Sequence, residues 1–316
     1  MTDAPVSHHT EPTFDPNKAL PRQATIVGGA VIGAAILALA VAGGSGPLTA
    51  AKAIVLGAVE GITEYLPISS TGHLLVTERI LGLGTGTGKV AADTYAVAIQ
   101  VGAILAVVVL YWQRLVQLFR GVIGRDSQGL QLLIRLIVAF LPAALIGAAF
   151  GDSIKEHLFG PWPVVAAWTV GGIFLLVWRP RPGTMGLMGL TNRHAAIIGA
   201  AQILALWPGT SRSLVTIVAA LALGCTMSAA IEFSFLLGLA TLTAATILDL
   251  AKDGPTLVKD YGWATPVLGG LVAFVTAVAS VRWLVSYLRT RPLTIFGWYR
   301  LFIAAVTVVL IATDVV

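Results

Sequence analysis

The stretch YLPISSTGH, residues 65–73, interrupts an apolar part of the chain that runs from about residue 50 to residue 82. A second stretch, WPGTSRS at 207–213, interrupts the apolar part 193–227 in the same way. Proline cannot continue a helix, and serine or threonine caps the start of the next one. Each half holds roughly 12 to 15 residues, whereas a membrane-crossing helix needs about 20. Each interrupted part is therefore predicted to form a re-entrant helix–loop–helix, which is tolerated where it is buried in protein or lines a water-filled cavity.

The composition is that of an integral membrane protein. Of the 316 residues, 57% are hydrophobic and only 11% are charged, whereas roughly a quarter of the residues of a soluble protein are charged. The net charge of +5 is not gathered into the basic face that nucleic-acid binding needs, so no nucleic-acid partner is expected. The single cysteine, Cys225, excludes an intrachain disulfide.

Seven windows are predicted to cross the bilayer, because each holds about 20 mostly apolar residues. They lie near 25–45, 94–112, 132–150, 161–178, 231–248, 263–281 and 297–313. Together with the two re-entrant segments, these windows predict an all-α polytopic membrane protein that contacts membrane lipids.

The charged connections between the windows predict the orientation. Cytoplasmic connections of membrane proteins carry an excess of lysine and arginine. Arginines outnumber acids at 113–131, 179–193 and 282–296, so these connections are predicted to be cytoplasmic. Acids balance bases at 151–160 and 249–262, which are predicted to lie outside. With this orientation, the first interrupted segment enters from the outer side and the second from the inner side.

The chain is therefore predicted to contain an inverted-topology repeat. Residues 1–24 form a polar cytoplasmic tail, and 25–49 form an extra transmembrane helix, whose length and leading tail favour an uncleaved anchor over a signal peptide. Residues 50–178 form the first repeat and 179–316 the second, inverted one, each with a re-entrant helix–loop–helix plus three transmembrane helices. GAVEGITEYLPISST in the first repeat aligns with GAAQILALWPGTSRS in the second. Inverted repeats place their site near the middle of the bilayer, where the broken helices meet.

The first break gathers ionisable and hydroxyl side chains. Glu60 and Glu64 are four residues apart and lie on one helical face. Each carboxylate costs about 2.5–3.5 kcal/mol at the centre of a membrane helix, so two of them need a partner, unless the helix ends near the interface and both reach water. Ser69 or Ser70 is predicted to cap the next half-helix, whose free N–H groups can bind an anion. His73 falls in the first turn of this half-helix, close enough for its ring to reach the break.

The second break supplies a cation. Arg212 has no acidic residue within nineteen positions on either side, and the planar fork of its guanidinium suits phosphate. Alternatively, Arg212 pairs with Glu60 or Glu64 and only holds the repeats together. Hydroxyl side chains flank it at Thr210, Ser211 and Ser213.

An anion site beside acid and base groups is typical of phosphoryl chemistry. Two carboxylates can also hold a divalent ion, because Mg²⁺ takes one or two carboxylates together with substrate phosphates. An inverted repeat is equally typical of transporters, so the architecture by itself does not indicate an enzyme.

VEGITEYLPISSTGH at 59–73, with PGTSRS at 208–213 followed by Thr216, strongly resembles the undecaprenyl-diphosphate phosphatase family of the bacitracin-resistance type. The likeness runs from about residue 50 to the C-terminus and includes VAIQVGAILAVVV, EFSFLLG and LTIFGWYRL. Two features depart from the family pattern. Leu214 stands where the family usually has glycine, and residues 1–49 have no family role.

The resemblance implies hydrolysis of the terminal phosphate of undecaprenyl diphosphate, which yields the monophosphate lipid carrier for cell-wall synthesis. The alternative is a transporter or flippase of polyprenyl phosphate, which the inverted repeat suits equally well. It also implies a divalent cation, Mg²⁺ or Ca²⁺, with Glu60 and Glu64 as candidate ligands, and a site open to the outer face of the plasma membrane. The implied catalytic residues are Glu60, Glu64, Ser70, His73 and Arg212. The implied substrate-binding residues are Ser69, Thr71, Ser211, Ser213 and Thr216.

Two further hypotheses concern mechanism and assembly. Ser70 is the candidate nucleophile, with Glu60 or His73 as its base, and direct attack by water is the rival. Gly57 and Gly61 form a small-xxx-small pattern that permits close helix contact. We expect this contact inside the repeat rather than between the subunits of a possible homodimer.

Overall fold

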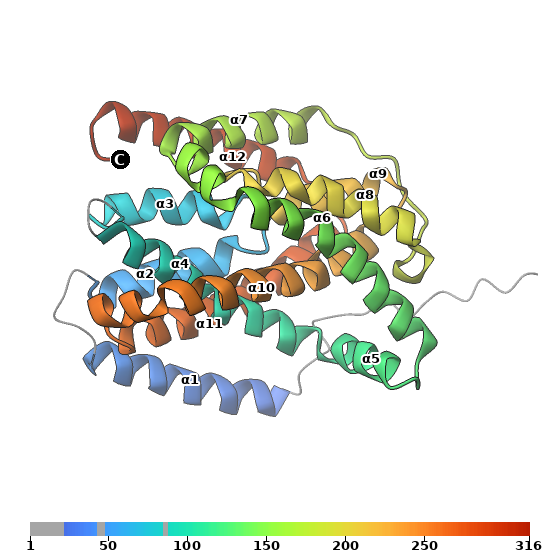
Figure 1. Cartoon of the computed structure of the whole chain (residues 1–316), viewed down its shortest axis with the longest axis horizontal. Coiled ribbons are helices and arrows are strands. Elements are labelled where there is room, and N and C mark those ends of the chain that lie inside the picture. Colours follow the sequence, from blue (N-terminus) through green and yellow to red (C-terminus); the bar gives the residue numbers. More distant parts are fainter. Residues whose placement is uncertain (1–21, 43–47, 85–87) are drawn as a thin grey trace, which may run out of the picture.

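The computed structural model describes residues 22–42, 48–84 and 88–316, and this part of the chain consists of helices and connections without a β-strand (Figure 1). The predicted tail 1–24 therefore lies almost entirely outside the described residues. The α-helices are α1 (Arg22–Ala42), α2 (Ala50–Thr63), α3 (Ser70–Ile80), α4 (Lys89–Leu110), α5 (Trp112–Val122), α6 (Ser127–Leu158), α7 (Pro161–Val177), α8 (Asn192–Gln202), α9 (Arg212–Ala222), α10 (Met227–Tyr261), α11 (Ala264–Leu288) and α12 (Thr294–Ala312). Two short 3₁₀ helices, η3 (Leu187–Gly189) and η4 (Ile203–Leu206), complete the list.

Five helices in the described residues are long and apolar enough to cross a membrane: α4, α6, α10, α11 and α12. They confirm five of the seven predicted crossings and an all-α, multi-pass membrane protein. The predicted crossing 161–178 is α7, whose 17 residues stand at the lower limit of about 17–25 for a crossing. The predicted crossing 25–45 corresponds to α1, and its residues 43–45 lie outside the described part.

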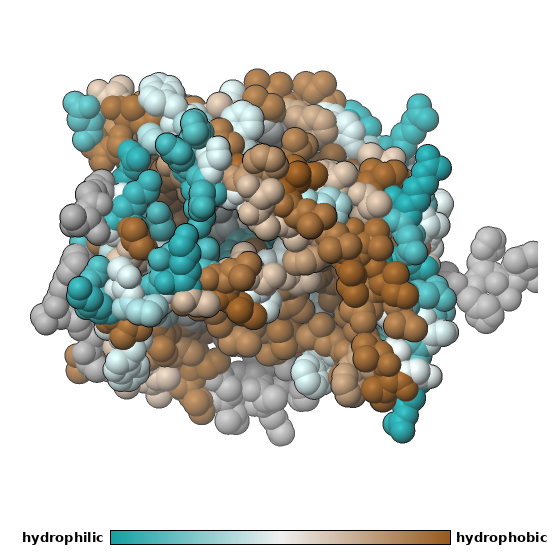
Figure 2. Space-filling model, in the orientation of Figure 1, coloured by the Kyte–Doolittle hydropathy of each residue, from teal (hydrophilic) through white to brown (hydrophobic). Residues whose placement is uncertain are grey.

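The surface matches a membrane environment. Large apolar side chains are exposed along the helices, among them Leu145, Val170, Leu248 and Phe302, which are 64–70% exposed. Figure 2 shows hydrophobic residues over the middle of one face and hydrophilic residues gathered at its two ends. An apolar belt between two polar ends is the arrangement that a bilayer requires.

Four of the five charged connections are more helical than we expected. α5 fills most of the connection predicted at 113–131, and α6 continues to Leu158. α10 continues to Tyr261 and α11 to Leu288. The physical reason is that lysine, arginine and glutamate end an apolar stretch but are good helix formers. The charges therefore mark where the apolar crossing ends, not where the helix ends.

Both interrupted segments fold as helix, break, helix. α2 ends at Thr63 and α3 begins at Ser70, while α9 begins at Arg212 after α8 and η4. Ser69 and Ser211 are the N-caps of α3 and α9, with φ values of 72° and 77°. Figure 1 shows the α2–α3 pair and the α8–α9 pair extending from opposite ends of the bundle towards each other.

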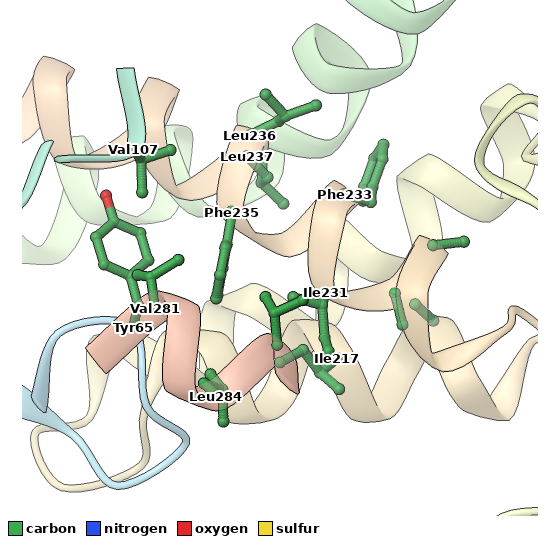
Figure 3. Packing of buried hydrophobic residues seen from close by; sticks show 14 of the residues in the cluster. Tyr65, Val107, Ile217, Ile231, Phe233, Phe235, Leu236, Leu237, Val281 and Leu284 are labelled. Carbon is green, nitrogen blue, oxygen red and sulfur yellow. The ribbon is translucent and has the colours of Figure 1, made fainter. Parts of the chain in front are cut away.

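The breaks lie inside the protein. Tyr65 at the end of α2 is fully buried and packs edge-on against Phe235 of α10, with 5.0 Å between ring centroids. Figure 3 shows this pair within the main hydrophobic cluster, together with Val281 and Leu284 of α11 and Ile217 of α9. Burial in protein is the condition under which broken helices are tolerated at membrane depth.

Glycines bring α2 and α11 close together. A Cβ at Gly57 would overlap the carbonyl oxygen of Gly269, and a Cβ at Gly61 would overlap Thr276 and the carbonyl oxygen of Ala273. The small-xxx-small pattern is therefore used within one chain. It joins α2 of the first predicted repeat to α11 of the second, so the contact lies within the chain and not between subunits, as we expected, but between the predicted repeats and not inside one of them.

We expect Gly57→Ala to destabilise the protein. The added Cβ forces the two helices apart, which costs about 1–3 kcal/mol by the usual measure of overpacking. The apparent melting temperature of the purified protein in detergent should fall. Gly33→Ala is the matched control, because no heavy atom lies within 4 Å of a Cβ at that position. Equal melting temperatures for the two variants would contradict the close approach of α2 and α11.

Candidate active site

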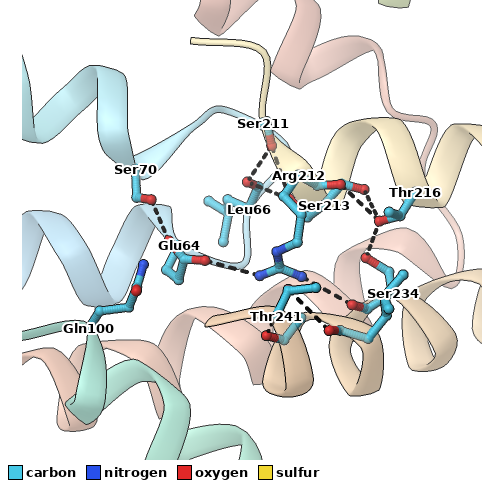
Figure 4. A network of polar contacts seen from close by, with 12 residues as sticks. Glu64, Leu66, Ser70, Gln100, Ser211, Arg212, Ser213, Thr216, Ser234 and Thr241 are labelled. Carbon is cyan, nitrogen blue, oxygen red and sulfur yellow. Dashed lines mark hydrogen bonds and ion pairs between the residues drawn. The ribbon is translucent and has the colours of Figure 1, made fainter. Parts of the chain in front are cut away.

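The two breaks contact each other directly. The backbone N–H of Gly209 donates to Ser69 Oγ at 3.1 Å. The hydroxyls of Ser213 and Ser211 both donate to the carbonyl oxygen of Leu66, at 3.0 Å and 3.4 Å (Figure 4). We call these two breaks, residues 64–73 and 207–213, the first tip and the second tip.

Glu64 joins the two tips through charge. One carboxylate oxygen accepts a hydrogen bond from Arg212 Nη2 at 3.0 Å, and the other accepts a hydrogen bond from the hydroxyl of Ser70. The side chains of Glu64 and Arg212 are only 5% and 11% exposed. A hydroxyl, a carboxylate and a guanidinium therefore lie in one chain of contacts with little access of water, where electrostatic interactions are strengthened.

The position of Arg212 is fixed on its other sides as well. Its Nη1 donates to the carbonyl oxygen of Ser234 at 3.0 Å, and its guanidinium lies 5.4 Å from the centroid of the Tyr65 ring. A Cβ at Gly238 would overlap the guanidinium, so only glycine leaves room for it there. These contacts orient the guanidinium towards Glu64, and its Nε has no hydrogen-bond partner within the described part of the chain.

Glu60 differs from Glu64 in its hydrogen bonding. It is 1% exposed, and neither carboxylate oxygen has a hydrogen-bond partner among the described residues. It lies one helical turn from Glu64 and interacts electrostatically with Glu64 and Arg212. A buried carboxylate without a partner is costly, so its free oxygens fit the prediction that a cation binds beside Glu64. The described residues contain no group of three acidic, histidine or cysteine side chains placed to hold a metal.

The imidazole of His73 makes its hydrogen bonds with Ser69 and Tyr299, and not with Ser70. Its Nδ1 lies 2.6 Å from the carbonyl oxygen of Ser69, and its Nε2 lies 2.9 Å from the hydroxyl of Tyr299. A carbonyl can only accept, so Nδ1 carries a hydrogen, and in the neutral ring Nε2 then accepts from the hydroxyl of Tyr299. The ring also packs edge-on against Trp168 at 4.9 Å. The group in contact with Ser70 is Glu64, whereas we expected Glu60 or His73.

The other predicted binding residues have separate surroundings. Thr216 is fully buried and shares a hydrogen bond of 2.7 Å with the hydroxyl of Ser234. Ser211 and Ser213 bond to each other at 3.1 Å and to the first tip. Thr71 lies exposed in the first turn of α3. Their roles in substrate binding stay predictions, because these contacts do not test them.

Residues of α7 and α12, which we did not predict as part of the site, bind the backbone of the two tips. Trp168 of α7 donates to the carbonyl oxygen of Ile68 at 2.8 Å. Arg300 of α12 donates to carbonyl oxygens of both tips and is fully buried. The sequence signal for Arg300 was a single arginine inside an apolar window. Trp168 and Tyr299 carried no such signal, since aromatic residues are common in membrane helices.

This fold and site define a multi-pass helical membrane protein in which a carboxylate, a hydroxyl and a guanidinium are buried together where two broken helices meet. Comparison with known proteins identifies the family. The chain belongs to the family described as Bacitracin resistance protein BacA, whose model matches residues 53–306. This match confirms the resemblance that the two tip motifs indicated, and it includes both tips but not α1.

Named relatives agree with this family. The chain is 44% identical over 261 residues to "Undecaprenyl-diphosphatase" of Sorangium cellulosum (strain So ce56), covering 80% of this chain and 83% of that protein. It is 43% identical over 254 residues to "Undecaprenyl-diphosphatase 2" of Rhodospirillum rubrum, covering 79% and 90%. It is 41% identical over 265 residues to "Undecaprenyl-diphosphatase" of Rhodopseudomonas palustris (strain BisA53), covering 83% and 97%.

Proposed function

We propose that this chain hydrolyses undecaprenyl diphosphate to undecaprenyl phosphate and inorganic phosphate, and so recycles the lipid carrier of cell-wall synthesis. The family and the names of its relatives support this activity. The observation that carries it is the position of Glu64, which accepts a hydrogen bond from the hydroxyl of Ser70 and pairs with Arg212 of the other tip. A potential nucleophile, its base and an anion-binding guanidinium are the parts that phosphate hydrolysis needs.

We infer that the chain is built as an inverted repeat, with re-entrant α2–α3 and α8–α9 pairs that enter from opposite leaflets. The similar conformations of the two N-caps support this inference, as do the two C-caps. Leu81 and Leu223 have φ, ψ values of −82°, 2° and −83°, 1°, and each is followed by a glycine with positive φ. The proposed units are 50–178 and 179–316, with 25–49 as the extra helix.

We also propose that the protein lies in the plasma membrane with its site reached from the outer face. The arginine-rich connections predicted to be cytoplasmic support this orientation, since positive charge stays inside.

In the proposed reaction, Ser70 Oγ attacks the terminal phosphorus and its proton passes to Glu64. The bond from that phosphorus to the bridging oxygen breaks, and the electron pair leaves with the lipid monophosphate. Water then hydrolyses the phosphoserine and restores the hydroxyl. Arg212 binds the phosphate oxygens on which charge accumulates. Direct attack by a water molecule, with Glu64 as its base, is the rival route.

We propose that Glu60 and Glu64 hold a divalent cation, Mg²⁺ or Ca²⁺, together with phosphate oxygens of the substrate. A bound cation of this kind neutralises charge that develops on the phosphate. The unpartnered oxygens of Glu60 support this assignment, as does the rule that Mg²⁺ sites use one or two carboxylates plus phosphates.

The test of the function is release of inorganic phosphate by purified protein from a long-chain polyprenyl diphosphate, with Mg²⁺ present. We expect turnover that a chelator abolishes and added Mg²⁺ restores. A transporter would instead move polyprenyl phosphate across vesicles and release no phosphate. Transport without phosphate release would refute the proposal.

Glu60→Gln should raise the Mg²⁺ concentration needed for half-maximal activity by about tenfold or more, because it removes one anionic ligand from the proposed cation site. Mg²⁺ titrations of phosphate release and of thermal stabilisation should both show the shift. Glu78→Gln is the control, since Glu78 is also a buried acid, with one oxygen that has no hydrogen-bond partner among the described residues, but it lies at the far end of α3. An unchanged Mg²⁺ requirement in Glu60→Gln would exclude Glu60 as a ligand.

A further inference from the structure

Arg300 connects the two tips to the helix that packs behind them. Its Nη1 donates to the carbonyl oxygens of Pro67 at 3.3 Å and Thr210 at 3.1 Å. Its Nη2 donates to the carbonyl oxygens of Gly209 at 2.8 Å and Ala167 at 2.9 Å. One side chain therefore binds the first tip, the second tip and α7 at the same time.

We propose that Arg300 is a positioning residue for the hydrolysis, which sets the two tips at the separation that lets Arg212 reach Glu64. This inference rests on the proposed function. Arg300 is 0% exposed, and its hydrogen bonds go to backbone carbonyls of the tips. It therefore acts on the reaction by fixing the positions of the tips.

The chemistry of the contacts explains why an arginine is required. Its side chain makes no ion pair with an acidic residue in the part of the chain that the structure describes. Burying a charge without an opposite charge is costly, so carbonyl oxygens alone must stabilise it. A guanidinium offers five donors in a fixed planar fork. The ammonium of lysine has three donors on a flexible stem, and cannot reach four carbonyl oxygens in three separate segments.

The surrounding backbone is shaped around this guanidinium. A Cβ at Gly171 of α7 would overlap Arg300 Nη2. At Gly209, φ is +95° and a Cβ would crowd Val164 and Ala167. Glycine at these two positions lets α7 and the second tip approach Arg300 closely enough to share its donors.

Loss of the hydrogen bonds of Arg300 should lower the rate of the reaction step more than it weakens substrate binding. Each tip alone keeps its own cap, but the distance between the tips depends on a few contacts, among them the one from Arg212 to Glu64 at 3.0 Å. Catalytic groups displaced by about 1 Å can lose about 10²-fold in rate. The lipid tail and the charge of Arg212 remain available for binding.

The test compares Arg300→Lys with Gly171→Ala, which keeps Arg300 but displaces its guanidinium. We expect kcat to fall by about 10²-fold in Arg300→Lys and by about tenfold in Gly171→Ala, with KM changed less than threefold. Arg135→Lys is the matched control, because Arg135 also donates to a backbone carbonyl, that of Met188, away from the tips. Its kcat should not change.

Two further measurements distinguish a positioning role of Arg300 from a general destabilisation of the protein. Hydrogen–deuterium exchange in peptides covering 64–73 and 207–213 should rise in both variants, while exchange in α4 and α11 stays at the wild-type level. This measurement needs no turnover, so it tests Arg300 even if the wild-type protein releases no phosphate. In Arg300→Lys combined with Arg212→Lys, the loss should be smaller than the product of the single losses. Wild-type kcat and wild-type tip exchange in both variants would overturn the proposal, as would exchange that rises equally throughout the protein.

Discussion

Arg212→Ala is expected to lower kcat for phosphate release by about 10³-fold or more. Arginines that bind the transferred phosphoryl group in other enzymes contribute about 10³–10⁵. Arg212 is the only cation in contact with Glu64 among the described residues, and its orientation is fixed by Ser234 and Tyr65. Its removal also leaves Glu64 buried without its positive partner. Initial rates with saturating Mg²⁺ and polyprenyl diphosphate measure the effect.

Two variants show whether this loss belongs to the site. Arg212→Lys keeps the charge but loses the planar fork, so we expect it to recover only part of the activity. Arg135→Ala removes another partly buried arginine away from the tips, and its activity should stay within about twofold of wild type. Arg212→Ala that folds normally and keeps more than a tenth of wild-type turnover would contradict a role in catalysis. The ion pair of Arg212 with Glu64 would then only hold the two tips together.

Glu64→Gln is expected to lower kcat by about 10³-fold. General acid–base groups contribute about 10²–10⁴, and glutamine preserves the size of the side chain while removing its ability to take the proton of Ser70. The change also removes the charge that pairs with Arg212 and one proposed cation ligand. Phosphate release at several Mg²⁺ concentrations separates these effects, because added Mg²⁺ can restore cation binding but not proton transfer.

Ser70→Ala provides the comparison for Glu64→Gln. If the hydroxyl is the nucleophile, both variants should be similarly inactive, and a phosphoserine should be trapped by rapid acid quenching of the wild-type protein. If water attacks directly, Ser70→Ala should keep substantial activity while Glu64→Gln does not. Full activity in Glu64→Gln would remove Glu64 from the chemistry.

The sequence was sufficient to predict the helical membrane fold and the meeting of the two tips. Proline followed by hydroxyl residues in short apolar segments indicated both breaks, and Ser69 is an N-cap as expected. From the lack of any nearby acid in sequence we expected Arg212 to bind phosphate, with pairing to Glu60 or Glu64 as the alternative, and the structure shows an ion pair with Glu64. The choice of Glu64 over Glu60 could not be predicted, because a spacing of four places both on one face and the path of residues 64–70 decides which one reaches Ser70.

The contacts behind the tips could not be predicted from sequence either. Arg300 lies inside the predicted crossing 297–313, where a lone guanidinium among apolar residues indicates a buried role. Its partners are backbone carbonyls, which every residue has, so no residue type marks them. The Nε2 contact of His73 with Tyr299 joins residues 226 positions apart, which local patterns cannot reveal.

The place of Arg300 in the sequence has a consequence for biogenesis. α12 follows every other element of the site along the chain, so during synthesis it emerges from the ribosome after both tips. Ser69 and Ser211 hold positive φ values that are unfavourable for serine, and the bonds from α12 arrive only when that last helix inserts. A nascent chain arrested before residue 294 would therefore carry every proposed catalytic group and still lack a finished site.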